Sequence, residues 1–119
     1  PQQTPPGAVI DAPVTNLDVF PTLCDIVGAT PPPWLQGKSL LPLLRGEAQT
    51  LHEHTFGEIN YHACYEATRS VRTPRYKFIR RFGQLGLPAL VNCDESRSKR
   101  YLMAQGWADR PVPAEALYD

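Results

Sequence analysis

Side chains able to bind hydroxyl groups or move a proton gather near the middle of the chain, at the end of an expected strand. They are a carboxylate, an amide and an imidazole, contributed by Glu58, Asn60 and His62. Such groups at a strand end can hydrogen-bond sugar hydroxyls or shuttle a proton. The alternative is internal pairing, in which His62 and Glu66 only contact the arginines of the next segment.

That next segment, residues 69–81, carries six cations and no anion, although the whole chain is neutral. Two Lys or Arg against seven Asp or Glu precede it, and four against five follow it. Such a cluster must face solvent, an anionic ligand or the acids of its own fold. Basic and aromatic residues alternate in it, as in nucleic-acid binding segments. Nucleic-acid-binding domains are usually strongly basic, whereas this chain has a pI of about 7.3, so we expect no nucleic-acid partner.

Metal binding and self-contained catalysis have little support. His52 and His54 share a strand face, but no third ligand is evident, and a solvated strand entry is expected there. Cys24, Cys64 and Cys93 are odd in number and lack C-x-x-C spacing, so we expect plain thiols, with Cys24 in the core. The common hydrolase, nucleotide-binding and zinc-protease motifs do not occur.

The elements that position these side chains begin with a helix over residues 16–28, which Asn16 or Thr15 caps and Gly28 ends. A rigid proline-rich connection leads to a short helix over residues 40–44. Three parts are expected in order: a linker with an entry strand (1–15), a helical segment (16–50), and an antiparallel-sheet subdomain (51–119).

The first helix has an unusual composition. It is apolar around most of its circumference, and its polar residues Asp18, Thr22 and Asp25 form one narrow stripe. A helix of this kind is buried on more than one side. Either it is a central core helix, or it packs against protein that is not present here.

The second half of the chain predicts a small sheet. Strand patterns cover residues 55–61, 68–73 and 76–82, the last two forming a hairpin. A helix over residues 96–105 and an extended segment over residues 111–119 follow. This order predicts an α+β fold: a small antiparallel sheet of about four strands with packed helices.

Three motifs follow one another in a fixed order. Residues 18–28 read D-x-x-P-T-L…G, residues 37–44 read G-x-S-L-x-P-L-L, and residues 69–79 read R-x-V-R-T-P-R-Y-K-F-I. With the closing Leu117–Asp119, they resemble the C-terminal part of a sulfatase of the alkaline-phosphatase superfamily. Residues 58–62, 65–66 and 92–94 are most similar to the heparan N-sulfatase (sulfamidase)-like branch.

The resemblance implies a division of labour. A large N-terminal catalytic domain, outside this chain, would hold a calcium ion and a formylglycine whose hydrated aldehyde attacks sulfur. This chain would complete the substrate cleft, carry no cofactor and hydrolyse nothing alone. Residues 93–97 mimic the formylglycine motif, but Glu95 stands where proline or alanine is required, so we interpret the match as coincidence.

The cleft wall is expected to be formed by Glu58, Asn60, His62, Arg69 and Arg72, which would hydrogen-bond or charge-pair with a sulfated sugar or related sulfate ester. The helix over residues 16–28 would dock on the missing catalytic domain. Alone, its exposed face would favour a homodimer or aggregation. No apolar run approaches the roughly 20 residues that span a bilayer, so no membrane partner is expected.

Two other interpretations remain open. One is a related phosphatase or phosphodiesterase of the same superfamily, and the other is a stand-alone anion-binding module. Because the chain begins with Pro1 and not Met, we expect it to be part of a longer polypeptide. The sequence does not choose among a periplasmic, a secreted and a cytoplasmic location.

Overall fold

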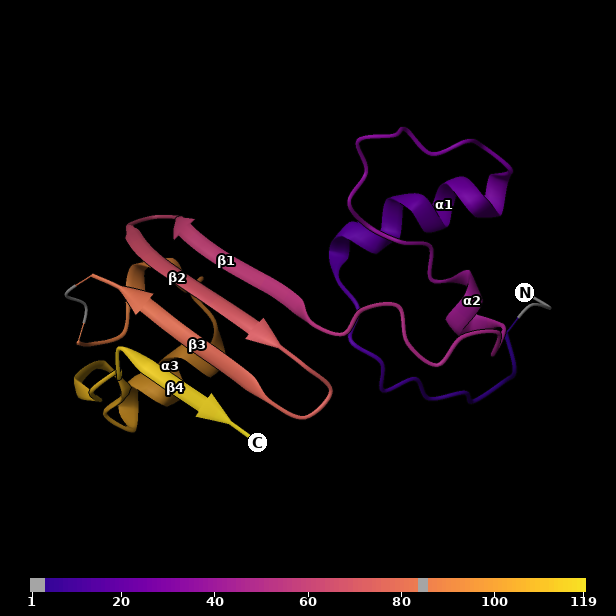
Figure 1. The fold of residues 1–119 in the computed structure, drawn as a ribbon. Coiled ribbons are helices and arrows are strands. Elements are labelled where there is room, and N and C mark those ends of the chain that lie inside the picture. Colours follow the sequence, from indigo (N-terminus) through magenta and orange to yellow (C-terminus); the bar gives the residue numbers. More distant parts are fainter. Residues whose placement is uncertain (1–3, 84–85) are drawn as a thin grey trace. The chain divides into compact units, whose positions relative to one another are not determined.

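The computed structural model describes residues 4–83 and 86–119. These residues form two compact units (Figure 1). The first unit extends to Thr55 and includes Arg72–Arg75, and the second unit consists of Phe56–Val71 and Tyr76–Asp119. Each unit is described by itself.

Helices dominate the first unit. A 3-10 turn, η1 (Asn16–Asp18), leads into α1 (Val19–Val27), and α2 (Leu41–Leu44) follows after a long connection. Thr15 forms a capping box with Asp18, and Gly28 ends α1 in the left-handed conformation, at φ 71°, that favours glycine. Both predicted ends of this helix are confirmed.

Two polar side chains of η1 and α1 are buried, while most of the large apolar ones are exposed. Asp18 is 0% exposed and Thr22 is 7% exposed, whereas Leu23 and Val27 are 52% and 74% exposed. Asp18 and Thr22 of the polar stripe are buried and accept hydrogen bonds from backbone N–H groups of the connection between α1 and α2, whereas Asp25 is exposed. The prediction of a central core helix is therefore wrong for this chain. The apolar side chains left outside are Leu17, Val19, Phe20, Leu23, Ile26 and Val27.

The second unit is built on a four-stranded antiparallel sheet in the order β1-β2-β3-β4 (Figure 1). The strands are β1 (Thr55–Tyr61), β2 (Tyr65–Arg72), β3 (Lys77–Phe82) and β4 (Glu115–Tyr118). In the β3–β4 pair, Phe78 is opposite Leu117 and Arg80 is opposite Glu115. The predicted α+β class is confirmed, with β2 beginning three residues earlier than expected.

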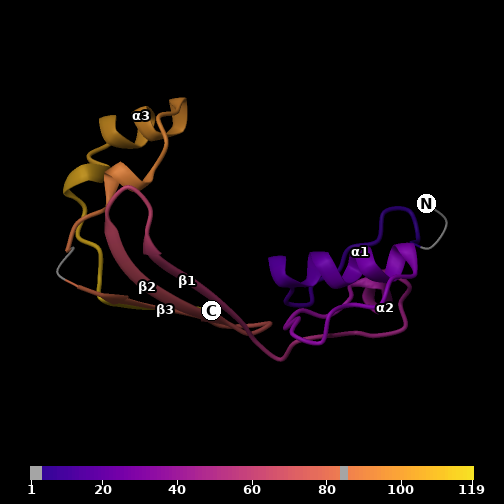
Figure 2. The same cartoon turned by 90° about the horizontal axis from the view of Figure 1, so that it is seen from above.

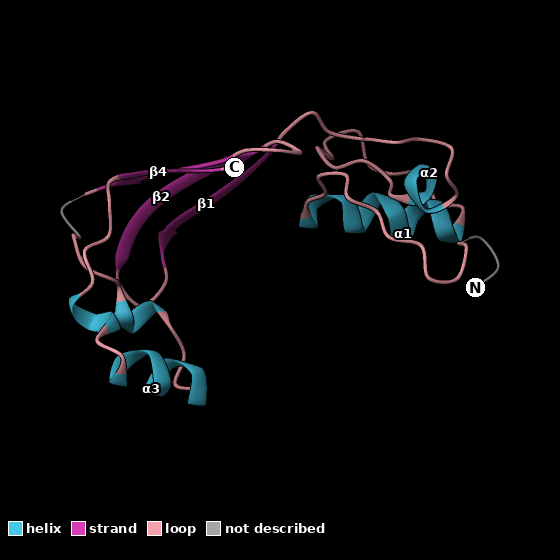
Figure 3. Ribbon diagram, turned by 90° about the horizontal axis from the view of Figure 1, so that it is seen from below, coloured by secondary structure: helices cyan, strands magenta, loops and turns pink. Residues whose placement is uncertain are grey.

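Helical segments lie between β3 and β4 in sequence. They are η2 (Leu90–Asn92), α3 (Arg97–Ala104) and η3 (Trp107–Asp109). Ser96 caps α3 by accepting a hydrogen bond from the Lys99 N–H at 3.0 Å. Figures 2 and 3 show β1 and β2 curving toward the side of the sheet on which α3 lies.

The hydrophobic core of the described residues is small. Cys24, Leu41 and Leu43 are buried in the first unit, as is Ala67 in the second. The location of Cys24 confirms the prediction for that thiol. Residues 8–14, where an entry strand was expected, run as an irregular segment. No helix in residues 4–83 and 86–119 is long and apolar enough to cross a bilayer.

Candidate functional site

Three of the five predicted site residues come together on β1 and β2. The Arg69 guanidinium lies 3.2 Å from the Glu58 carboxylate and donates to Asn60 Oδ1 at 2.6 Å. The third guanidinium nitrogen, Nη1, donates to the Ile59 and Thr68 carbonyls at 3.1 and 3.0 Å. The side chains remain 42% exposed for Arg69 and 63% exposed for Glu58, so the group can still reach a ligand from solvent.

The other two predicted site residues lie elsewhere. His62 follows β1 in the turn to β2, where its backbone N–H donates to the Cys64 carbonyl at 3.3 Å. Arg72 is the exposed last residue of β2. Its segment, Arg72–Arg75, belongs to the first unit. The cluster defined by the structure is therefore Glu58, Asn60 and Arg69, which we call the arginine cluster.

The sequence argument missed Asn92, which holds the turn between β1 and β2. Its Oδ1 accepts from the N–H groups of Ala63 and Cys64 at 2.9 and 2.8 Å. Its Nδ2 donates to the Cys64 carbonyl at 3.3 Å and to Glu66 Oε2 at 2.8 Å. Two acceptor and two donor positions of the amide are thus all used. Glu66 is fixed by this amide, whereas the sequence suggested an arginine partner.

Replacing Asn92 with alanine is expected to lower the free energy of unfolding by about 1–3 kcal/mol. The reason is that the N–H groups of Ala63 and Cys64 lose their acceptor and the Glu66 carboxylate loses its donor. Asn92→Asp should cost more, since it removes both donors and places a second carboxylate beside Glu66. Urea unfolding of the full chain measures the change. The control is Val91→Ala at the neighbouring exposed position, expected within about 0.5 kcal/mol of wild type. Equal stability of the Asn92 and Val91 variants would show that the Asn92 hydrogen bonds do not hold the turn between β1 and β2.

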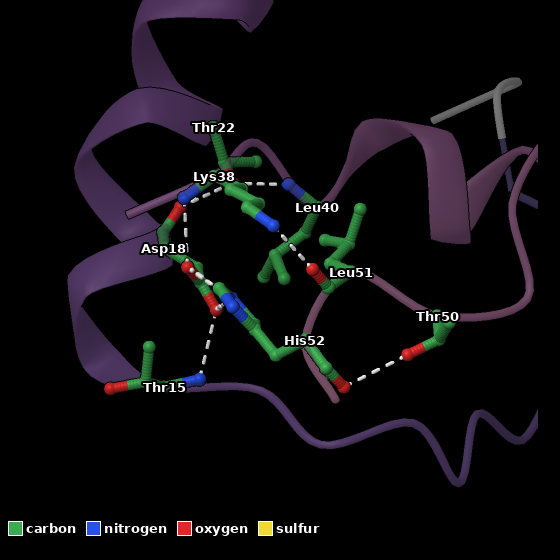
Figure 4. A network of polar contacts seen from close by, with 8 residues as sticks. All are labelled: Thr15, Asp18, Thr22, Lys38, Leu40, Thr50, Leu51 and His52. Atoms are coloured by element: carbon green, nitrogen blue, oxygen red, sulfur yellow. Dashed lines mark hydrogen bonds and ion pairs between the residues drawn. The ribbon is translucent and has the colours of Figure 1, made fainter. Parts of the chain in front are cut away.

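A second polar network ties the start of α1 to distant segments of the first unit (Figure 4). The Asp18 carboxylate accepts from the N–H groups of Thr15 and Lys38, each at 2.9 Å. Both of its oxygens lie 3.0 Å from His52 Nε2. The Lys38 ammonium donates to the Leu51 carbonyl at 2.6 Å, which joins the same two segments.

The position of His52 corrects the sequence interpretation. A solvated strand entry was expected at residues 52–54, but the His52 side chain is only 14% exposed and is turned onto Asp18. The partner is 34 residues away in sequence, so no local pattern could have indicated it. Nε2 is engaged by a carboxylate, and no group of three or more His, Cys, Asp or Glu side chains able to hold a metal is found among the described residues.

The environment of Asp18 sets its protonation. Burial raises the pKa of the carboxyl. The N–H groups of Lys38 and Thr15, together with the hydrogen bond and charge of His52, lower it by more. The pKa of Asp18 therefore lies below its ordinary value of 3.8.

This lowered pKa predicts an acid-sensitive first unit. Because the folded-state pKa is below the unfolded one, the carboxylate contributes its full stability above the ordinary value of 3.8, and that contribution is lost as the pH falls through the folded-state pKa. Urea unfolding between pH 6 and pH 2.5 should show this loss. The Asp18→Asn variant should have a flatter pH profile over the same range. Direct titration of the Asp18 carboxyl carbon by NMR tests the pKa even where the variant does not fold; a midpoint above 3.8 would contradict the assignment.

Residues 93–97 have structural contacts at the start of α3. The Lys99 ammonium donates to the Cys93 carbonyl at 2.9 Å and pairs with Glu95 at 3.0 Å. Ser96 is the N-cap. Glu95 and Ser96 therefore have structural roles at the start of α3.

Comparison with known proteins gives one family match. The model of the family described as "N-sulphoglucosamine sulphohydrolase, C-terminal" matches residues 1–98.

Several curated relatives are similar over parts of the chain. A "Delta 4,5-hexuronate-2-O-sulfatase" of Bacteroides thetaiotaomicron is 43% identical over 67 residues, 53% of this chain. An "Ulvan-active sulfatase" of Formosa agariphila is 28% identical over 124 aligned residues, 100% of this chain. The "Steryl-sulfatase" of Mus musculus is 39% identical over 74 residues, 60% of this chain. The chain spans 14%, 25% and 11% of these relatives' own lengths.

Two solved structures are similar to part of this chain, with TM-scores below 0.5. A 2-O GAG sulfatase shares 29% identity at a TM-score of 0.46, with 75% of this chain and 21% of that chain covered. A protein solved with D-glucosamine-2-N,6-O-disulfate shares 20% identity at a TM-score of 0.49, with 80% and 19% covered.

Proposed function

Since the chain belongs to the family of N-sulphoglucosamine sulphohydrolase C-terminal regions, we propose that it forms the substrate-cleft wall of a sulfatase that hydrolyses sulfuric esters or sulfamates of sugars. The family match over residues 1–98 is the observation that carries this proposal. The names of the hexuronate and ulvan relatives support a sugar substrate, and the family description supports the sulfamidase branch.

The arginine cluster is the proposed contact with substrate. A guanidinium presents several donors in a fixed plane that suits the oxygens of an anion. Glu58 and Asn60 hold Arg69 in place through contacts of 3.2 and 2.6 Å, so little side-chain freedom remains to be lost on binding. The Glu58 and Asn60 oxygens already accept from Arg69 and Asn60 N–H groups, and their second lone pairs can accept from sugar hydroxyls. His62 and Arg72 stay in the proposal as flanking contacts at the two ends of β2.

Calcium and formylglycine chemistry is proposed for protein outside these residues. The described side chains do not fit a calcium site, because no three candidate ligands converge. No step of hydrolysis is therefore assigned to this chain. Its part would be to bind and orient the sulfated group.

The proposed partner is the remainder of a sulfatase polypeptide, seated on the apolar side of α1. The relatives are four to about nine times longer than the part this chain spans. Leu17, Phe20 and Leu23 are each 50–56% exposed, which is unfavourable for side chains of this size in water. A second copy of the chain is the competing occupant. Sedimentation of the chain with and without the remainder of the polypeptide distinguishes the two: a dimer that persists in the complex would contradict the proposal.

The function is tested on the complete polypeptide that carries these residues. Sulfate released from sulfated disaccharides, and phosphate released from phosphorylated counterparts, are measured side by side. We expect sulfate release, and a fall in kcat/KM of about 10-fold or more for Arg69→Ala, the effect of one lost charged hydrogen bond. Arg69→Lys should recover part of it, and Arg97→Ala on the exposed side of α3 should behave as wild type. Release of phosphate alone would favour the phosphatase interpretation and contradict the proposal.

A further inference from the structure

An open hollow of about 380 Å³ lies on the sheet of the second unit. Every second residue of β2 and of β3 borders it, as expected for side chains on one face of the strands. Gly57 of β1 leaves space there, because a Cβ at this position would lie 2.9 Å from Ser70 Oγ. The side chains around the hollow are Ile59, Glu66, Thr68, Ser70, Lys77, Ile79 and Arg81, with Glu58 at its border.

A hydroxyl in this hollow has no protein partner. Thr68 Oγ1 is buried and makes no hydrogen bond with any residue that the structure describes. The neighbouring Ser70 hydroxyl makes only a long contact of 3.4 Å with the Gly57 carbonyl. Buried hydroxyls are normally hydrogen-bonded, and an orphan calls for a partner from outside the chain. A ligand with hydroxyl groups can supply both a donor and an acceptor.

The charges around the hollow favour an anion. Lys77 and Arg81 of β3 border it, together with the carboxylates of Glu66 and Glu58. The Glu58 carboxylate is already paired with Arg69 at 3.2 Å, so it offsets the two cations less than a free carboxylate would. Arg81 is held at its place by donating to the Pro113 carbonyl at 2.9 Å, and Glu66 by the Asn92 amide at 2.8 Å. Lys77 is exposed and can meet an incoming anionic group.

We propose that this hollow is a binding subsite for a sulfated sugar unit. The sulfate would contact Lys77 and Arg81, and a ring hydroxyl would satisfy Thr68 Oγ1. The substrate class rests on the proposed function, but the site is separate: of the predicted cleft-wall residues only Glu58 borders it.

The test uses the full chain, with glucosamine 6-sulfate as the probe and unsulfated glucosamine as its matched control, and follows binding by NMR titration. We expect the sulfated probe to bind at least 5-fold more tightly than the unsulfated one. Lys77→Ala should weaken its binding about 10-fold and Thr68→Val about 3- to 10-fold. Lys99→Ala, which removes a cation of α3, should leave binding unchanged. Equal affinity for the two sugars, or unchanged affinity in both hollow variants, would overturn the subsite.

Thermal unfolding gives an independent reading of the orphan hydroxyl. Thr68→Val should leave the unfolding midpoint unchanged or raised, because no hydrogen bond is lost. Thr22→Val should lower the midpoint, since that hydroxyl donates to the Asp18 carbonyl and accepts from Leu40 N–H at 2.8 Å. A drop for Thr68→Val as large as that for Thr22→Val would reveal an internal partner and overturn the argument.

The outcome is separable from that of the proposed function. If the complete polypeptide releases sulfate in an Arg69-dependent manner while the hollow variants bind the probe as wild type does, the function stands and the subsite fails. If the hollow discriminates the two sugars but no sulfate is released, the subsite stands and the hydrolase proposal fails.

Discussion

Replacing Asp18 with alanine is expected to destabilise the first unit by about 3–5 kcal/mol, the range observed when one member of a buried charged pair is removed. The carboxylate is 0% exposed and accepts hydrogen bonds from two backbone N–H groups and from His52. Without it, the N–H groups of Thr15 and Lys38 and the His52 imidazole lose their acceptor. Each such buried donor costs about 1–3 kcal/mol when left unpaired.

The effect should be visible locally as well as globally. The Lys38 amide donates to Asp18, so its hydrogen-exchange rate reports the network directly. Exchange should accelerate in the Asp18→Ala variant along with the loss of stability in urea. His52→Ala should have a smaller effect, about 1–3 kcal/mol, because the carboxylate keeps its two backbone donors.

Asp25→Ala is the matched control for Asp18→Ala. Asp25 lies on the same helix and on the same polar stripe, but it is exposed. Its replacement should change stability by no more than about 0.5 kcal/mol. If the two aspartate variants are equally stable, the buried network does not hold the first unit together.

Replacing Gly37 with alanine is expected to cost about 3 kcal/mol or more, at the upper end for an added methyl group in a packed site. A Cβ at this position would lie 1.9 Å from the Leu17 carbonyl oxygen and 2.9 Å from the Asp18 backbone nitrogen. Both are backbone atoms of η1, which cannot turn away as a side chain can. Relief of the clash must separate residues 36–38 from η1, and this separation also lengthens the hydrogen bond from Lys38 to Asp18.

Gly57→Ala provides the comparison, because its Cβ would meet only the end of a side chain, Ser70 Oγ at 2.9 Å. A rotation of Ser70 relieves that contact, and the loss of glycine freedom in the unfolded chain offsets part of the cost, so stability should change by less than about 1 kcal/mol. Urea unfolding of the two glycine variants measures the difference. A Gly37→Ala protein as stable as Gly57→Ala would mean that the close backbone approach is not required.

These two predictions give physical content to two of the sequence motifs. In the segment D-x-x-P-T-L, the aspartate is the buried acceptor for backbone N–H groups, and Thr22 supplies a second bridge to Leu40 at 2.8 Å. In G-x-S-L-x-P-L-L, the glycine is the residue that permits contact with η1. The motifs therefore meet at one place in the first unit, and the sulfated ligand proposed above would be bound by the second unit.

Local sequence patterns were enough to locate most elements of the fold. The cap Thr15, the stop at Gly28 and the strand β1 occur where the sequence predicts them, because caps and strand alternation depend on neighbouring residues. The helix expected over residues 96–105 is also present, as α3. The basic hairpin was also predicted, although β2 extends further back, to Tyr65. Residues 8–14, expected as an entry strand, have no strand assignment among the described residues.

The candidate site was only partly predictable. Glu58, Asn60 and Arg69 could be singled out by residue type, but the cross-strand contact of Arg69 with the first two depends on strand register. Residues 92–94 entered the family resemblance, but nothing local indicated the structural role of Asn92, because its partners Ala63, Cys64 and Glu66 lie 26–29 residues away. The hollow with the orphan Thr68 hydroxyl also required the sheet to bring three strands together.

The sequence by itself determined the sulfatase family, the four-stranded antiparallel sheet and the ends of its first helix, because motifs, alternation and caps are properties of contiguous residues. Only the tertiary structure decided that Asp18 and Thr22 are buried while most apolar side chains of η1 and α1 are exposed. Which face of a helix is buried depends on the hydrogen-bond partners that distant segments bring to it, and for Asp18 and Thr22 those partners are 18–34 residues away.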